Sequence, residues 1–223
     1  MNAGRLWNLS LAAVAGGLLT LPCLGAGWTL DGEWRLDYVP QPLSGAVRDL
    51  PLKVPFRTVK ASVPGNCELD LVNAGVLPPL EIGLNVLQTR RYEGHQWLYT
   101  KTFDAPDVPR DGSRATLVFD GIDTLADVFL NGEKIGETAN MLIPHRFDVT
   151  ERLKKGANTV QVLIRSAFCE TQGKSVGQMT YHMGFADNVP FRKAAHMGGW
   201  DIFPRIYATR RYVGISCSRS RYS

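Results

Sequence analysis

The clearest pattern in the chain is an alternation of apolar and polar side chains, which is typical of β-strands that bury one face. Between residues 28 and 36, large apolar residues alternate with polar ones around a glycine. The same period of two recurs, with interruptions, at residues 97–103, 115–119, 126–130 and 159–164. Short strands at this spacing, separated by turn residues, predict an all-β antiparallel sandwich.

Two turn signals refine this picture. Asn131-Gly132 follows one predicted strand, and this dipeptide readily supplies both positive φ angles of a type I′ turn, so the chain is expected to return as a hairpin. Asn66 is placed to cap a short helix that Gly75 ends. The segment 166–189 has no clear period and is predicted to be a long excursion from the sandwich.

The N-terminal residues predict an export signal. Arg5 supplies positive charge, residues 6–24 are nearly all apolar or small, and residues 25–27 offer small side chains for cleavage. We therefore expect residues 1–27 to be a signal peptide and the mature chain to begin near Trp28, which makes the protein secreted or periplasmic. A membrane anchor is the alternative, but glycines, an asparagine and a proline interrupt the stretch, which is marginal for a bilayer span.

The cysteines leave disulfide pairing open. Cys23 falls in the predicted signal, and lipoprotein anchoring there is disfavoured because Pro22 occupies the place of a small residue. Cys67, Cys169 and Cys217 remain, an odd number without the paired spacing of a zinc site. One bridge among them fits an exported protein.

Size and charge limit the classes of function. A chain of 223 residues with 44% hydrophobic residues can bury the core of one domain. Its formal net charge is only +4, and much of the excess arises from arginines near the C-terminus rather than from a basic stripe. Nucleic acid is therefore not an expected partner.

No catalytic constellation is evident from residue types and spacing. A retaining glycosidase needs two carboxyl groups roughly 5 Å apart, whereas Asp120 and Asp123 flank a Gly-Ile dipeptide in a way better explained by turn chemistry. The histidines are scattered and lack metal spacing, and no phosphate loop or dinucleotide fingerprint is present. We therefore expect no catalytic residue, no metal and no cofactor.

Trp200 and Asp201 are the candidate substrate-binding residues. An indole stacks on the C–H face of a sugar while an adjacent carboxylate accepts hydrogen bonds from its hydroxyls. The alternative is structural, with Trp200 plugging the sandwich and Asp201 capping a turn. Gly198-Gly199 before the pair and Pro204 after it favour an exposed loop.

Several segments, read together, resemble the N-terminal domain of family 2 glycoside hydrolases, especially the β-mannosidase branch. The Gly-Ile-Asp-Thr run at 121–124 with Leu-Asn-Gly at 130–132 is fairly specific for this domain class, and Arg192-Lys193 followed by Gly199-Trp200-Asp201 points to the β-mannosidase branch. The others are Val63–Asn66, Glu68–Leu71, Ala74-Gly75, Trp97–Tyr99, Asn140-Met141 and Phe147–Thr150.

The resemblance implies a galactose-binding-like jelly-roll β-sandwich with one or two short helices, spanning residues 28–215. In that family the domain packs on a catalytic barrel that carries both catalytic glutamates, and its Trp-Asp loop contacts the sugar in the cleaved subsite. Trp200 and Asp201 would then bind a β-mannoside or related glycan, with the barrel as a missing partner in the same gene. Residues 216–223 are expected to be an unrelated or disordered tail, as in a truncated gene. An autonomous secreted carbohydrate-binding or interaction module is the alternative function.

Overall fold

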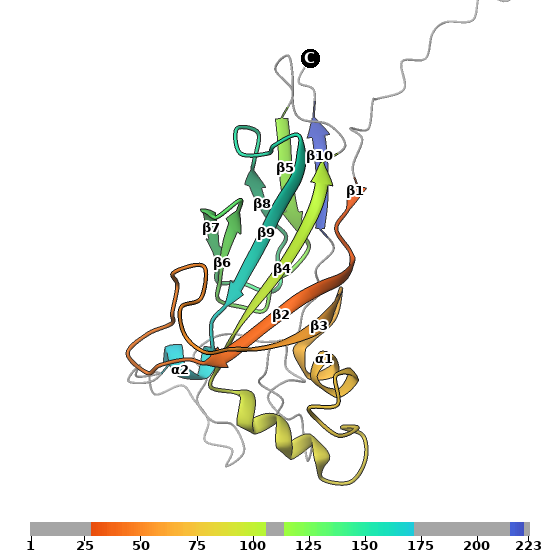
Figure 1. The fold of residues 1–223 in the computed structure, drawn as a ribbon, viewed down its shortest axis with the longest axis vertical. Helices are drawn as coiled ribbons and strands as arrows, with labels where there is room; N and C mark the ends of the chain where they lie inside the picture. The colour runs from red at the N-terminus through yellow and green to blue at the C-terminus, as the bar shows by residue number, and fades with distance from the viewer. Residues whose placement is uncertain (1–27, 106–113, 172–214, 221–223) are drawn as a thin grey trace, which may run out of the picture.

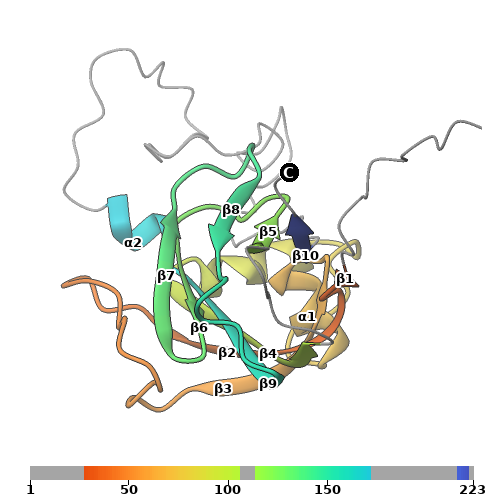
Figure 2. The ribbon, with the colours of Figure 1, turned by 90° about the horizontal axis from the view of Figure 1, so that it is seen from above.

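The computed structural model describes residues 28–105, 114–171 and 215–220. Within these ranges two antiparallel sheets pack face to face around a shared apolar core (Figures 1 and 2). The all-β jelly-roll sandwich with few short helices, predicted from the alternation and the resemblance, is confirmed.

The larger sheet has six strands, in the order β3-β2-β4-β9-β6-β7, and every neighbouring pair is antiparallel. Strand β4 is the longest of the described strands; residues 95–100 pair with β2 on one side, and residues 97–105 pair with β9 on the other. The strands span Gly32–Pro40 (β2), Arg57–Val63 (β3), His95–Ala105 (β4), Ala126–Leu130 (β6), Glu133–Thr138 (β7) and Gly156–Ile164 (β9).

The smaller sheet has four strands, in the order β1-β10-β5-β8. They span Trp28–Thr29 (β1), Arg114–Phe119 (β5), His145–Asp148 (β8) and Ile215–Ser220 (β10). Strand β10 pairs with β5 over its whole length, so residues 216–220, which we expected to be a tail, lie within a sheet. The end of the related sequence at residue 215 stays a prediction.

The core is formed where the inward faces of the two sheets meet. Trp34 and Leu36 of β2 and Trp97 and Tyr99 of β4 are at most 2% exposed. On the opposing sheet, Phe119 is fully buried, and its ring meets that of Phe147 edge-on with centroids 6.0 Å apart. The alternating pattern in the sequence therefore marks the inward positions, because every second strand residue points to the same face.

A second apolar cluster covers the outer face of the six-stranded sheet. Leu98, Phe129 and Leu163 point outward from β4, β6 and β9 and are buried. The connection between β2 and β3, residues 41–56, folds over them with Val47 and Leu50 among its contacts. This explains why those strands carry apolar residues on both faces.

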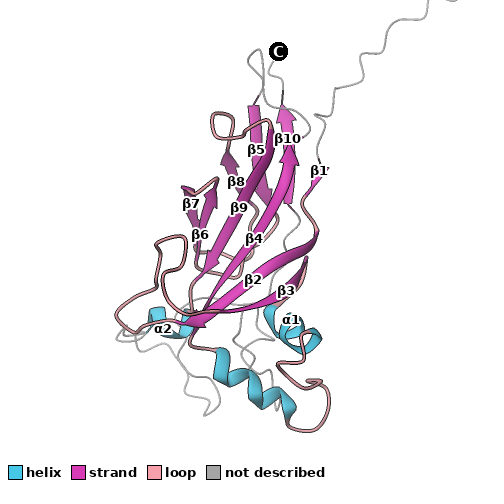
Figure 3. Ribbon diagram, viewed as in Figure 1, coloured by secondary structure: helices cyan, strands magenta, loops and turns pink. Residues whose placement is uncertain are grey.

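The helices gather at one end of the sandwich (Figure 3). Helix α1, Cys67–Asn73, is the predicted one: the side chain of Asn66 accepts a hydrogen bond from Leu69 N at 2.9 Å, and Gly75 follows with φ of 71°. The 3₁₀ helix η1, Asn85–Tyr92, and the short helix α2, Ala167–Thr171, were not predicted. Thr89 is the only buried residue of η1, so its sequence carries no helical apolar stripe.

The predicted hairpin is present between β6 and β7. Asn131 and Gly132 have φ angles of 54° and 86°, as a type I′ turn requires. The Asn131 side chain also fixes the turn, because its Nδ2 donates to Arg152 O and to Asn158 Oδ1. The Asn-Gly signal therefore identified the turn, whereas the register shift between Val128 and Phe129 was not predicted.

Replacing Phe119→Ala should lower the free energy of unfolding by about 3–5 kcal/mol, because it opens a cavity in a fully buried part of the core. Urea denaturation of the two proteins checks this. Leu142→Ala is the control, since Leu142 is 63% exposed and its loss should cost less than about 0.5 kcal/mol. Equal losses in the two variants would contradict this description of the core.

Candidate functional site

The predicted substrate-binding residues, Trp200 and Asp201, lie outside the described residues. Their exposure on a loop and their role in sugar binding stay predictions. The described structure reaches the segment that carries them only as far as α2, which ends at Thr171.

The chain is held firmly to the sandwich where it enters α2. Gln41 connects to both ends of this junction, because its Nε2 donates to Glu170 Oε1 at 2.8 Å and its Oε1 accepts from Ser166 N at 2.7 Å. Arg165 Nη1 lies 3.3 Å from the other Glu170 oxygen. The start of the segment leading to Trp200 is thus fixed by hydrogen bonds to the end of β2.

Behind this junction lies a buried charge cluster centred on Asp127 of β6. The Asp127 side chain is fully buried, and Lys134 Nζ lies 2.7 Å from its Oδ1. Arg165 Nε and Arg48 Nε lie 3.5 and 3.7 Å from its Oδ2. Glu137 on β7 contacts the same three cations.

The charges in this cluster shift one another's pKa values. Burial alone would lower the pKa of Lys134, but its hydrogen bonds to Asp127 and Glu137 outweigh burial and raise it. The hydrogen bond from Lys134 lowers the pKa of Glu137. The ion pairs of this cluster connect the β6–β7 hairpin to Arg165, directly after β9. Removing one partner would leave an uncompensated charge in a buried place.

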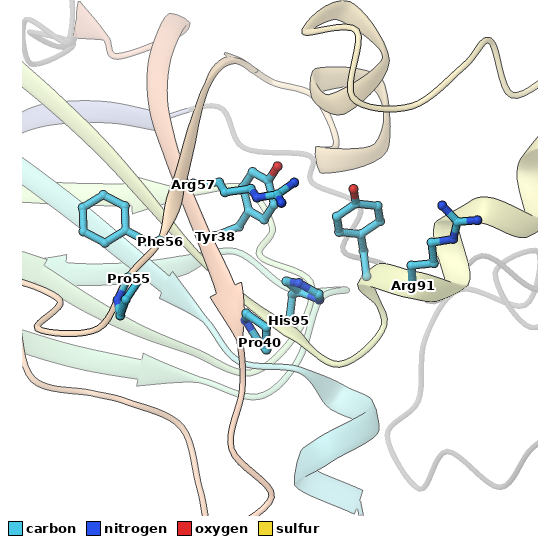
Figure 4. Close-up of a pocket in the computed structure, with 8 residues that line it drawn as sticks. Tyr38, Pro40, Pro55, Phe56, Arg57, Arg91 and His95 are labelled. Carbon is cyan, nitrogen blue, oxygen red and sulfur yellow. The ribbon is translucent and has the colours of Figure 1, made fainter.

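A pocket of about 390 Å³ opens near the ends of β2, β3 and β4 (Figure 4). We call it the aromatic–arginine pocket. Its walls come from β2, the connection between β2 and β3, β3, η1 and β4, and are lined by Tyr38, Pro40, Pro55, Phe56, Arg57, Arg91, Tyr92 and His95. Strand register brings them together, because Tyr38 of β2 lies opposite Arg57 of β3 and Pro40 lies opposite His95 of β4.

Aromatic contacts form the floor and one side of this pocket. The Tyr38 ring stacks on Trp97 with centroids 5.4 Å apart and meets Tyr92 edge-on at 5.9 Å. The His95 ring lies 5.1 Å from Tyr92. These packed rings hold the residue at the end of η1 against the sheet.

The pocket is electropositive. Arg57 and Arg91 are exposed, and neither has an ion-pair partner within the described ranges. Burial and, secondarily, the Arg57 charge lower the pKa of His95, which therefore favours the neutral imidazole. Burial raises the pKa of Tyr92, with a smaller contribution from Tyr38. The lining can bind and orient a ligand, but it offers no carboxylate pair for acid–base catalysis.

The described aspartates and cysteines that the sequence singled out do not line the aromatic–arginine pocket. Asp120 is exposed and Asp123 is buried, accepting a hydrogen bond from the Thr124 hydroxyl, and both lie in the connection between β5 and β6. This position between two strands agrees with a turn role, which stays a prediction. Cys67 and Cys169 are both buried, while Cys23 and the side chain of Cys217 lie outside the description.

Within residues 28–105, 114–171 and 215–220, the structure shows neither a cluster of metal ligands nor a membrane-spanning helix. No group of three or more His, Cys, Asp and Glu side chains there is arranged to hold a metal ion. No helix in those ranges is long and apolar enough to cross a bilayer.

Sequence reasoning missed the aromatic–arginine pocket. Its lining residues are spread over residues 38–95, and only the register of three strands makes them neighbours. The one local signal is the close spacing of Arg91, Tyr92 and His95, three side chains suited to polar recognition just before a predicted strand.

Comparison with known proteins places this fold in a family context. Residues 44–215 match the family described as glycosyl hydrolase 2 galactose-binding domain-like. β-Mannosidase B from Thermothelomyces thermophilus is 36% identical over 182 residues, covering 79% of this chain and 20% of the relative. β-Mannosidase from Rattus norvegicus is 30% identical over 157 residues, covering 69% and 16%. The chain thus spans about a fifth or less of these relatives.

Solved structures agree with the fold. The crystal structure of β-D-mannosidase from Dictyoglomus thermophilum aligns with a TM-score of 0.66 and 33% identity, over 86% of this chain and 22% of that one. A β-glucuronidase from Bifidobacterium dentium aligns with a TM-score of 0.52 at 20% identity, over 89% of this chain and 30% of that one, which shows a shared fold alone. The sandwich is therefore of the galactose-binding-like type.

Replacing Asp127→Asn should lower the free energy of unfolding by about 3–5 kcal/mol, because Arg48, Lys134 and Arg165 would then share only Glu137 and Glu170, which leaves one positive charge of the cluster uncompensated. Urea denaturation measures the loss. Glu133→Gln is the matched control, since Glu133 forms an exposed pair with Arg152 that is worth about 0–1 kcal/mol. A loss no larger than that of the control would show that the buried cluster is not stabilising.

The His95 imidazole should titrate below pH 6.5 in an NMR titration, because burial and Arg57 disfavour its charged form. Since the folded pKa is lower than the unfolded one, this group should reduce stability as the pH falls below 6.5. Arg57→Gln should raise the pKa of His95, and Arg114→Gln on the other sheet should not. A His95 pKa at or above 6.5 would contradict this prediction.

Proposed function

We propose that this chain, which belongs to the glycosyl hydrolase 2 galactose-binding domain-like family, serves as the non-catalytic N-terminal domain of a β-mannosidase-like glycoside hydrolase. Its role would be to contribute a sugar-contacting loop to an active site whose catalytic glutamates lie on a barrel domain. Hydrolysis of terminal β-linked mannose or a related β-glycoside is the activity proposed for the whole enzyme.

One observation carries the proposal. The family match runs through residues 44–215 and so includes both the sandwich and the Trp200–Asp201 segment. Relatives that match most of this chain bear the name β-mannosidase, in a fungus and a mammal alike. This combination favours a domain that works inside a glycosidase.

Trp200 and Asp201 would divide the recognition of the sugar between them. The indole would stack on the apolar C–H face of the ring, while the carboxylate would accept hydrogen bonds from hydroxyl groups. Charge-assisted hydrogen bonds contribute more than neutral ones, so Asp201 would supply most of the orientation. The anchored start of the segment, at Gln41 and Glu170, is consistent with a loop that must be positioned.

We also propose a signal peptide and the bounds of the mature domain. Residues 1–27 would direct secretion or periplasmic location, on the evidence of Arg5 and the apolar stretch that follows it. Residues 28–215 would form the mature jelly-roll domain. A carbohydrate is the expected partner in either compartment.

An autonomous carbohydrate-binding module is the second candidate function. The aromatic–arginine pocket favours it, because β2, β3, β4, η1 and the β2–β3 connection build the pocket without any other domain. The two functions differ in what they require. Only the first depends on Trp200 and Asp201 meeting a barrel.

Grafting residues 28–215 into an intact related β-mannosidase and replacing Asp201→Ala should lower kcat/KM about 10- to 100-fold. The reason is that a hydrogen bond to a charged group contributes roughly 1.5–3 kcal/mol, and about 1.4 kcal/mol is a factor of ten in rate. Hydrolysis of an aryl β-mannoside measures the effect, with thermal unfolding to check the fold.

Asp104→Ala in the same graft is the control, because Asp104 is exposed on β4 and should leave kcat/KM unchanged. If Asp201→Ala and Asp104→Ala hydrolyse the substrate at the same rate as the unmodified graft, Asp201 does not contribute to the subsite and the proposed role is wrong.

A further inference from the structure

We infer that the aromatic–arginine pocket binds a carboxylate-bearing sugar, such as a uronic acid. This inference does not depend on the proposed role of Trp200 and Asp201, because the pocket is built by residues 38–95. It rests on the charge of the pocket, the nature of its walls, its size and an unsatisfied hydrogen-bonding atom.

The positive charge of the pocket favours an anionic ligand. Two of the eight lining side chains are guanidinium groups and none is a carboxylate. The charges of Arg57 and Arg91 both act to lower the pKa of Tyr92, so both guanidinium groups lie near the Tyr92 hydroxyl. Within the described ranges, neither charge has an ion-pair partner. A carboxylate between them would relieve their repulsion and accept the paired N–H groups that guanidinium presents.

The walls suit a ring with an apolar face. Phe56 and Tyr92 line the pocket together with Pro40 and Pro55, whereas Tyr38 is only 3% exposed and offers little surface of its own. Phe56 keeps 39% of its surface exposed, which leaves ring area available for contact. Aromatic faces pack against the C–H surface of a sugar ring, whereas a bare inorganic anion would leave them in water.

A buried nitrogen lacks a partner in the pocket. Nδ1 of His95 is buried and has no hydrogen-bond partner among the described residues. Leaving such an atom unsatisfied costs free energy, but protein atoms cover it, so the imidazole would have to rotate before a ligand hydroxyl could satisfy it. The tyrosine hydroxyl of Tyr92, which lies near both arginines, can bond a further hydroxyl or the carboxylate.

The size of the pocket favours a single sugar residue over a peptide. A volume of about 390 Å³ lies at the low end of the range of roughly 300–1,000 Å³ typical of small-molecule sites. An acidic peptide would need an extended groove or a strand edge for its backbone. The lining instead forms one compact, open hollow between β2, β3 and the end of η1.

Galacturonate and galactose are the matched probes, because they differ only in a carboxylate in place of a hydroxymethyl group. In NMR titrations of the whole chain, galacturonate should bind at least tenfold more tightly than galactose, with shifts at His95 and Tyr92. Arg57→Gln and Arg91→Gln should each weaken galacturonate binding at least fivefold. Both arginines are exposed, so these variants should fold, and thermal unfolding checks that they do.

Arg114→Gln is the control variant, because Arg114 lies on β5 and pairs with Asp148 outside the pocket. It should leave galacturonate affinity unchanged. Equal affinity for galacturonate and galactose would overturn the inference, as would Arg57→Gln and Arg91→Gln variants that bind like the unmodified chain. Acetate or a glutamate-rich peptide binding as tightly as galacturonate would also overturn it, in favour of a plain anion site or a protein partner.

Discussion

The antiparallel register of β2 with β3 and β4 is the constraint on which both the core and the pocket depend. It places Tyr38 opposite Arg57 on one side and Trp97 on the other, and it places Pro40 opposite His95. Trp34 and Leu36 lie on the same inward face of β2 as Tyr38. A slip of one residue would turn that face toward solvent, so the burial that stabilises the sandwich also fixes the geometry of the pocket.

A second constraint acts at the other edge of the six-stranded sheet, where Asp127 is buried among cations. A buried carboxylate is tolerated only when opposite charges and hydrogen bonds compensate its lost hydration. Here the compensating cations come from the β2–β3 connection, β7 and the end of β9. Arg165 also forms an ion pair with Glu170 of α2. The charge cluster therefore links the body of the sandwich to the start of the segment that leads to Trp200.

The strands and their turns were predictable because their signals are local. The alternation at Trp97–Phe103 and the Asn131-Gly132 turn each depend on neighbouring residues, and both are confirmed. The helix η1 was missed because it buries only Thr89 and so shows no apolar stripe. The aromatic–arginine pocket was missed because Tyr38, Arg57 and His95 become neighbours only through strand register, which no local pattern encodes. Trp200 and Asp201 were singled out by the chemistry of an indole beside a carboxylate and supported by the family resemblance, and their role stays a prediction.

The most direct test of the proposed function is an NMR titration of the whole chain with methyl β-mannoside, following the Trp200 indole N–H and the Asp201 amide. A domain that supplies part of a sugar subsite should bind weakly, since a pocket without its other walls makes few contacts. The account predicts saturable shifts at these two signals that Asp201→Ala abolishes. Shifts confined to other residues, with Trp200 and Asp201 unmoved at saturation, would contradict it.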